Sequence, residues 1–310
     1  MNSVYMAKPR YGGWVSFTSH LCLKTNGKLF KIGNRSEKST RKYGYGVEYQ
    51  NLAISDIQKL DNLLITAIDK NYYKYLNDFP DGTHIVIHDP TEVKGRSCQP
   101  VIDNLKRFNV VTIRKTVQEF LLNKFGIESN FLLHPFYEFN KTNIEKTNKA
   151  VSISRIDYDK HTEIILEANK KLENKIDIYG YRKLGELDLD SCYRGRFEKS
   201  FIELDKILGK SKYVVDMSAI KNDGGGSQYT FLESIYENCV LILSDKWIEG
   251  IVDSVYVNGI NCHIVSDFDE LVNIINLDGS QIELSKNAYK LLQPHIDVDW
   301  NVLMKKKTGT

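Results

Sequence analysis

Short runs of apolar and β-branched residues alternate with longer amphipathic segments along most of this chain, which predicts a parallel α/β fold. Predicted buried strands cover residues 62–68, 83–89, 109–114 and 129–135 in the front half. In the back half they cover 150–155, 175–180, 211–217, 239–245 and 261–266. Helices are expected over 116–126, 162–174 and 268–276, with Gly126 closing the first and Asp267 capping the last.

The length of 310 residues suits two such domains. The polar segment 137–149 has no apolar periodicity and is the best candidate for a linker. We therefore expect each domain to have its own sheet, with a cleft between the two. Ligands of parallel sheets gather at the carboxyl ends of the strands, so the loops that follow the strands are the places to look for chemistry.

Charge is distributed unevenly. Residues 1–145 hold 20 Lys+Arg against 14 Asp+Glu, a net charge of +6, whereas the remaining 22 and 26 give −4. The front half is therefore a candidate for facing a polyanion. The alternative is a basic, solvated surface without a polymeric partner.

Composition and cysteine spacing exclude several classes. An apolar content of 42% argues against a disordered chain. No apolar run approaches the roughly 20 residues that span a bilayer, and the first residues lack the apolar core of a secretory signal. Five cysteines stand singly, without metal-binding spacing, which favours buried, reduced thiols in a cytoplasmic protein.

Two loops of the front half carry candidate site residues. Gly12 and Gly13 precede a predicted helix, whose free N–H groups suit an anionic or sugar ligand, although a plain turn fits equally. His88 and Asp89 end a predicted strand before Pro90, where they could bind hydroxyls or move a proton. The alternative for this pair is a turn-capping aspartate beside a satisfied edge histidine.

Two loops of the back half suit a nucleotide. Arg155 and Lys160 follow a strand and precede a helix, which favours a diphosphate clamp over surface cations that balance Asp157 and Asp159. The stretch "NDGGGSQYTFLES" (222–234) places three glycines before a helix, where backbone can approach phosphate closely. Glu233 then lies one to two turns into that helix. It is either a reader of ribose hydroxyls or an exposed helix acid.

Taken in order, these stretches resemble the retaining GT-B nucleotide-sugar glycosyltransferases. The residues that carry the resemblance are "YGGWVSFTSHL", "IHD", "SRIDYDK", "IDIYG" and "GGGSQYTFLESIYENCVLILSD". The resemblance implies two Rossmann-like domains, 1–145 for the acceptor and 146–283 for the donor. It also implies that 284–310 is a helix, broken by Pro294, that returns to the first domain and ends in a basic, disordered tail.

The resemblance also implies residue roles. Arg155 and Lys160 would neutralise the donor diphosphate, Glu233 would hold the ribose, and His88 would hydrogen-bond the sugar. The donor would further be lined by Gly12, Gly13, Gly224, Gly225, Gly226, Ser227, Gln228, Tyr229 and Thr230. No cofactor is obligatory beyond the UDP-sugar co-substrate, and the motif does not require a divalent metal. Gly225 stands where many relatives keep a glutamate, which leaves the donor sugar open.

Within that group, "HD" and "YTFLE" are most similar to bacteriophage α-glucosyltransferases that act on hydroxymethylcytosine in DNA, which implies His88 and Asp89 as the catalytic pair. The protein would then lie in the cytoplasm of a host cell and modify double-stranded DNA. The expected DNA contacts are Arg35, Lys38, Arg41, Lys42, Tyr43 and Tyr45, which interleave cations with rings that can stack on bases. A mobile surface loop explains the same segment equally well.

The sequence therefore predicts a hexosyl- or pentosyltransferase that uses a nucleoside-diphosphate sugar and a hydroxymethylated pyrimidine in DNA. One alternative keeps the enzyme class and replaces DNA with a glycan or lipid-linked acceptor. Another is a nucleotide- or nucleic-acid-binding module without transfer activity. The sequence carries no signal for an oligomeric state.

Overall fold

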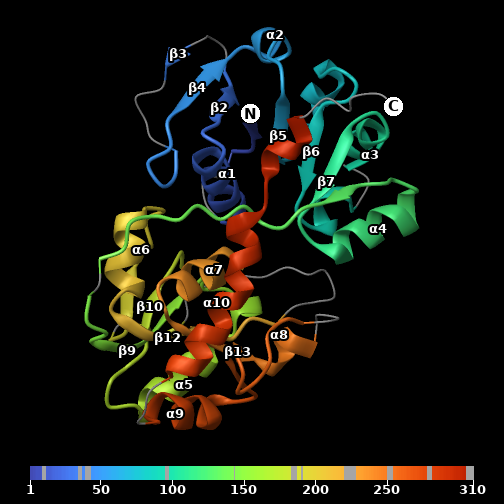
Figure 1. The fold of residues 1–310 in the computed structure, drawn as a ribbon. Helices are drawn as coiled ribbons and strands as arrows, with labels where there is room; N and C mark the ends of the chain where they lie inside the picture. Colours follow the sequence, from blue (N-terminus) through green and yellow to red (C-terminus); the bar gives the residue numbers. More distant parts are fainter. Residues whose placement is uncertain are drawn as a thin grey trace. The chain divides into compact units, whose positions relative to one another are not determined.

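The computed structural model describes residues 1–8, 12–33, 37–38, 43–94, 98–142, 144–182, 187–189, 191–219, 228–249, 254–277 and 281–304. The chain forms two compact units (Figure 1). Unit 1 comprises Met1–Glu138 with His295–Thr310, and unit 2 comprises Phe139–Pro294. Unit 2 thus begins seven residues before the expected boundary and ends eleven residues after it.

Unit 1 is built on an eight-stranded sheet of order β3-β4-β2-β1-β5-β6-β7-β8. All neighbouring strands are parallel except β3 and β4. The strands are β1 (Asn2–Met6), β2 (Lys28–Ile32), β3 (Glu37–Lys38), β4 (Tyr49–Leu52), β5 (Leu63–Ile68), β6 (His84–Ile87), β7 (Asn109–Thr112) and β8 (Asn130–Phe131). Its helices are α1 (Gly13–Lys24), α2 (Ile54–Ile57), α3 (Gln99–Leu105) and α4 (Lys115–Phe125), with 3-10 turns η1 (Tyr73–Asp78), η2 (Pro90–Val93) and η5 (Trp300–Met304).

The central strand β1 shows why the sheet is covered on both faces. Successive side chains of a strand point to opposite faces. Val4 and Met6 accordingly join the core that includes residues of α3 and α4, whereas Tyr5 packs in a second core with Val15 of α1. Burial on both faces is what a parallel sheet requires.

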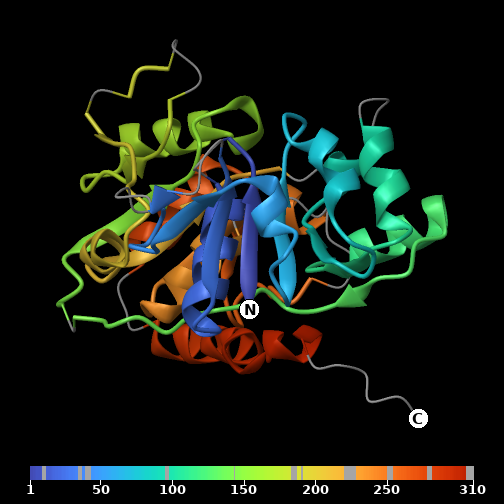
Figure 2. The same ribbon diagram turned by 90° about the horizontal axis from the view of Figure 1, so that it is seen from above.

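Unit 2 is a six-stranded, fully parallel sheet of order β11-β10-β9-β12-β13-β14 (Figure 2 gives a second view). The strands are β9 (Asn148–Ile153), β10 (Asp177–Tyr179), β11 (Tyr193–Gly195), β12 (Ser211–Asp216), β13 (Val240–Ser244) and β14 (His263–Val265). The helices are η4 (Tyr158–Lys160), α5 (Thr162–Lys171), α6 (Phe201–Leu208), α7 (Gln228–Tyr236), α8 (Asp245–Glu249), α9 (Phe268–Asn276) and α10 (Ile282–Asp297).

Several local predictions are confirmed. All nine predicted strands are present, Gly126 closes α4 in the left-handed conformation, and the Asp267 side chain accepts a hydrogen bond from the Glu270 N–H at the start of α9. All five cysteines are free and buried. The structure adds β1 to β4 and β11, which are short or carry polar residues at alternate positions.

One expectation about the connections was wrong. Pro294 does not break the last helix, because α10 continues through it to Asp297. The boundary between the two units falls within the expected linker segment, 137–149. In this segment Phe139 stacks on Phe201 at 4.4 Å, and the Lys146 ammonium donates to the carbonyl oxygens of Leu208 and Glu237. Charged and aromatic side chains thus fasten a segment that looks featureless in the sequence. The expected basic tail, 305–310, lies outside the described residues. Within the part of the chain that the structure describes, no helix has both the length and the apolar content to cross a membrane.

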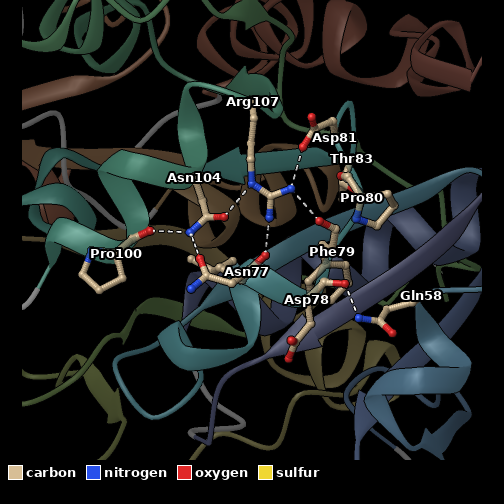
Figure 3. Close-up of polar contacts among 11 residues, drawn as sticks. Gln58, Asn77, Asp78, Phe79, Pro80, Asp81, Thr83, Pro100, Asn104 and Arg107 are labelled. Atoms are coloured by element: carbon tan, nitrogen blue, oxygen red, sulfur yellow. Dashed lines mark hydrogen bonds and ion pairs between the residues drawn. The ribbon is translucent and has the colours of Figure 1, made fainter.

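One partly buried guanidinium, that of Arg107, ties the loop before β6 to α3 and β7 (Figure 3). Arg107 donates to the carbonyl oxygens of Leu76 and Phe79 at 2.7 and 2.6 Å, and to Asp81 at 2.8 Å. The Asn104 side chain accepts from Arg107 Nε. This network lies at the amino ends of β6 and β7, so its role is structural.

We expect Arg107→Ala to destabilise unit 1 by about 2–4 kcal/mol, because it removes several charge-assisted hydrogen bonds and leaves two carbonyl groups without their donor. Hydrogen exchange of the β6 and β7 amides, followed with denaturant, would measure the loss. The exposed neighbour Lys106 provides the control, since Lys106→Ala should change stability by no more than about 0.5 kcal/mol. Equal protection in the two variants would contradict this role.

Candidate functional site

Each sheet reverses its direction of growth beside its central strand. In unit 1 the chain passes from β1 to β2 on one side and returns to β5 on the other, and in unit 2 the corresponding strands are β9, β10 and β12. Ligands of open parallel sheets bind outside the carboxyl ends of the strands at such a switch point. The loops after β1 and β5, and those after β9 and β12, are therefore the candidate sites.

At the switch point of unit 2, Lys160 meets the end of β12. Its ammonium donates to the Ser218 hydroxyl oxygen at 2.8 Å, across 58 positions of sequence. The Ser218 hydroxyl donates in turn to Asp216, and its backbone N–H donates to the same carboxylate at 2.9 Å. A cation is thus held in a fixed position where the β12 strand ends.

Arg155, the second predicted clamp residue, follows β9 and is half-exposed. Its guanidinium contacts Asp157 at 3.2 Å and Asp159 at 2.8 Å. The charge balance considered as the alternative to a clamp is therefore present in this structure. An incoming diphosphate would have to share this guanidinium with two carboxylates.

Glu233 lies on the inner face of α7 and is 1% exposed. It acts electrostatically on two neighbours. Burial lowers the pKa of Lys199 while the Glu233 charge raises it, and burial together with Glu233 raises the pKa of Tyr229 well above its ordinary value. Glu233 is therefore a buried acid beside a cation, not an exposed helix acid. Gln228 and Thr230 lie in the first turn of α7, and Gly224 to Ser227 lie outside the described residues.

At the switch point of unit 1, Gly12 caps α1 with φ 87°, a conformation that favours glycine. No side chain caps this helix start, and Gly13 has open space where a Cβ would lie. The Lys8 N–H donates to Asp69 at 2.6 Å, which joins the loops after β1 and β5. Ser16, Thr18 and Ser19 of α1 are buried.

His88 is buried at the end of β6, 6% exposed. Its Nε2 lies 2.7 Å from the Thr66 carbonyl oxygen, and since a carbonyl only accepts, Nε2 carries the proton. The ring packs edge-on against Phe17 at 4.8 Å. Burial lowers the pKa of His88 to about 4, so the imidazole is neutral at pH 7 with Nδ1 as an acceptor.

Asp89 and Glu92 form a turn around η2. Asp89 accepts from the Thr91 N–H at 2.7 Å, and Glu92 Oε2 accepts from the His88 N–H at 2.9 Å. Asp267 and Glu270 repeat this D-x-x-E arrangement at α9, which resembles a capping box. Asp89 is thus the local cap that the sequence left open as an alternative.

Glu92 was missed by sequence reasoning, although its D-x-x-E spacing was a usable signal. It is 5% exposed, and burial together with Asp89 raises the pKa of its carboxyl well above the ordinary value. Arg114, at the start of α4, acts on the charges of Glu92, His88 and His134. Lys199 and Ser218 were also missed, because only the fold brings them to Glu233 and Lys160.

The expected DNA contacts divide into two groups. Tyr43 and Tyr45 pack inside unit 1: Tyr43 lies edge-on to Tyr5 at 5.0 Å, and the Tyr45 hydroxyl bonds the Ser16 hydroxyl at 3.0 Å. Neither ring is placed to stack on a base. Lys38 belongs to β3, and Arg35, Arg41 and Lys42 lie outside the described residues. Among the described residues, no group of three or more His, Cys, Asp or Glu side chains could hold a metal ion.

The raised pKa of Glu92 predicts a pH-dependent stability difference. The folded state favours the protonated acid, so this stabilisation is complete below about pH 4.5, the ordinary glutamate value, and is lost as pH rises through the folded pKa. Glu92→Gln keeps the acceptor for His88 and cannot ionise. Its melting temperature should therefore rise relative to wild type between pH 5 and 8, whereas that of the exposed-site control Glu119→Gln should not. A constant difference across this range would contradict burial of a protonated acid.

No protein-family model matches the sequence, and no curated protein sequence does either. Several solved structures are similar in fold. Anabaena Alr3699/HepE, in complex with UDP and glucose, has a TM-score of 0.65 at 11% identity, over 98% of this chain and 97% of that one. An α-glucosyltransferase in complex with UDP and a 13-mer DNA containing an HMU base has a TM-score of 0.65 at 14% identity, over 95% of each chain.

S. aureus TarM has a TM-score of 0.57 at 17% identity, and the match covers 81% of this chain and 56% of TarM. At such identities a likeness establishes the fold. The predicted fold class is therefore confirmed: the chain consists of two Rossmann-like units of the GT-B type.

Proposed function

We propose that this protein is a retaining glycosyltransferase that moves a sugar from a nucleoside-diphosphate sugar, UDP-linked, to a hydroxyl group of modified DNA. The observation that carries the proposal is the cation Lys160, held by Ser218 at the switch point of a GT-B donor unit. A fixed ammonium beside a helix start suits a diphosphate. Complexes of similar folds with UDP support the same donor.

In this proposal the donor lies along the carboxyl edge of unit 2. Lys160 and Arg155 neutralise the diphosphate. Arg155 then shares its guanidinium N–H groups between the diphosphate and the carboxylates of Asp157 and Asp159. The Glu233 carboxylate accepts from the ribose hydroxyls, and Lys199 lies beside it. Gln228 and Thr230, in the first turn of α7, line the phosphates and the sugar.

The reaction breaks the bond between the anomeric carbon and the diphosphate oxygen and forms a bond from that carbon to the acceptor oxygen on the same face. The acceptor proton passes to the leaving diphosphate. His88 is a weak base at neutral pH because burial lowers its pKa to about 4. We therefore assign it a hydrogen bond to the sugar through Nδ1, with Asp89 holding the turn that positions it.

DNA as the acceptor is supported by the basic front half of the chain and by the similar fold of an α-glucosyltransferase solved with DNA. A glycan or lipid-linked acceptor keeps the same donor chemistry. A binding module without transfer activity would turn over no nucleotide sugar, and its affinity for its partner would not depend on Glu233. These alternatives separate in the two experiments that follow.

Lys160→Ala should weaken UDP binding about 10- to 100-fold, because it removes a charge-assisted contact with the diphosphate. Isothermal titration calorimetry with UDP would measure this. Lys170→Ala removes an exposed cation of α5 that pairs with Glu167, and it should bind UDP as the wild type does. If both variants bind UDP equally, Lys160 is not part of the donor site.

Incubation with radiolabelled UDP-glucose should label duplex DNA that contains 5-hydroxymethylcytosine and leave unmodified duplex unlabelled. A panel of other nucleotide sugars covers the open donor. Glu233→Gln should reduce the rate at least tenfold by weakening ribose binding. Donor hydrolysis without DNA labelling would indicate another acceptor. No turnover of any donor would reject the glycosyltransferase proposal.

A further inference from the structure

Exposed lysines follow four consecutive strands of the unit 1 sheet. Lys8 follows β1, Lys70 follows β5, Lys94 follows β6 and its turn η2, and Lys115 follows β7. These strands are neighbours in the order β1-β5-β6-β7, which can be followed in Figure 1 for β5 to β7. Because parallel strands end at the same edge, the four side chains arise from one edge of the sheet.

The carboxylates of the same edge are engaged within the protein. Asp69 accepts from the backbone N–H groups of Lys8 and Asn71 at 2.6 and 2.8 Å. Asp89 caps η2, and Glu92 is buried. In the described part of the chain none of the four lysines forms an ion pair, and the Lys94 ammonium lies over the Phe120 ring, 5.6 Å from its centroid. The exposed charge of this edge is therefore positive.

The spacing of the four loops fits a nucleic-acid backbone. Neighbouring strands lie about 4.8 Å apart, so four strands span roughly 14 Å. One strand of duplex DNA carries a phosphate about every 3.4 Å of helix axis, and this span therefore faces about four phosphates.

A membrane surface fits less well. Interfacial binding requires exposed apolar side chains that enter the headgroup region. Among the described residues of unit 1, the exposed large apolar side chains are Leu122 of α4 and Val302 of η5, and neither belongs to the four loops.

We propose that Lys8, Lys70, Lys94 and Lys115 form a phosphate-binding row for duplex DNA. This row differs from the segment 34–42 predicted from the sequence, and it deepens the proposed function by assigning acceptor contacts on the catalytic edge of unit 1. Phosphate contacts position a duplex without reading its sequence, so the row would bind modified and unmodified DNA alike.

The test compares two charge reversals of equal size. Lys70→Glu with Lys94→Glu changes the row, whereas Lys28→Glu with Lys106→Glu changes two exposed lysines near the amino ends of β2 and β7. Fluorescence anisotropy with a labelled duplex, with and without 5-hydroxymethylcytosine, gives affinity at several salt concentrations. The row variant should lose at least tenfold in affinity, and its slope of log K against log salt should fall by about 1.8, or 0.9 for each phosphate contact. The control variant should keep the wild-type slope.

Equal losses in the two variants would overturn the row, because overall charge would then explain binding. Absence of DNA binding by the wild type would overturn it as well. If phosphatidylserine vesicles bind in a row-dependent way and DNA binding does not depend on the row, the surface faces a membrane and the proposal fails. Calorimetry with UDP on both variants tests the donor site separately, and both should bind UDP with wild-type affinity. If the wild type itself does not bind UDP, the donor site is rejected. The DNA-binding result would then still decide whether the row exists.

Discussion

The parallel pairing of β9 with β10 on one side and β12 on the other is the constraint on which unit 2 depends. Parallel strands need a crossover between them, so residues that end neighbouring strands come from distant parts of the sequence. Lys160 and Ser218 meet in this way across 58 positions. The same pairing brings Gly180 of the β10 end against the Ser154 carbonyl, where a Cβ would lie only 1.7 Å away, so only glycine fits there.

Charged side chains at the carboxyl edges of the two sheets have different partners. In unit 2, cations at the carboxyl edge contact carboxylates: Arg155 pairs with Asp157 and Asp159, and Lys199 lies beside Glu233. In unit 1, the carboxylates of Asp69 and Asp89 accept hydrogen bonds from backbone N–H groups of the loops. A site that must hold a diphosphate and release it gains from cations whose positions are fixed before the ligand arrives, because less ordering is then required on binding. A surface that meets a polymer gains from exposed cations.

Sequence patterns predicted the elements that local physics determines. Apolar runs such as "CVLILSD" and caps such as Asp267 were recognisable, because burial on both faces and an uncapped helix start each leave a local signature. The strands β1, β2 and β4 were not predicted, because "NSVYM", "KLFKI" and "YQNL" mix polar with apolar residues. Their burial comes from neighbours far along the chain. Tyr43 and Tyr45 were interpreted as part of a nucleic-acid surface because they stand beside basic residues in the sequence. Tertiary packing instead places their hydroxyls against Thr18 and Ser16.

The pairs of side chains that determine the chemistry of a site are distant in the sequence, so no local sequence pattern predicts that they lie close together. Glu233 was recognisable as an acid early in a helix, but its neighbour Lys199 stands 34 positions earlier, on another loop, and no local pattern connects the two. A buried carboxylate without a cation would take up a proton and could no longer accept from two ribose hydroxyls. Glu92 illustrates the effect of burial: it is similarly buried and lies beside Asp89, and its pKa is raised well above the ordinary value in spite of Arg114. Two buried glutamates in the same chain thus have different neighbours: Glu233 lies beside the ammonium of Lys199, whereas Glu92 lies beside the Asp89 carboxylate and accepts from the His88 N–H that holds the turn.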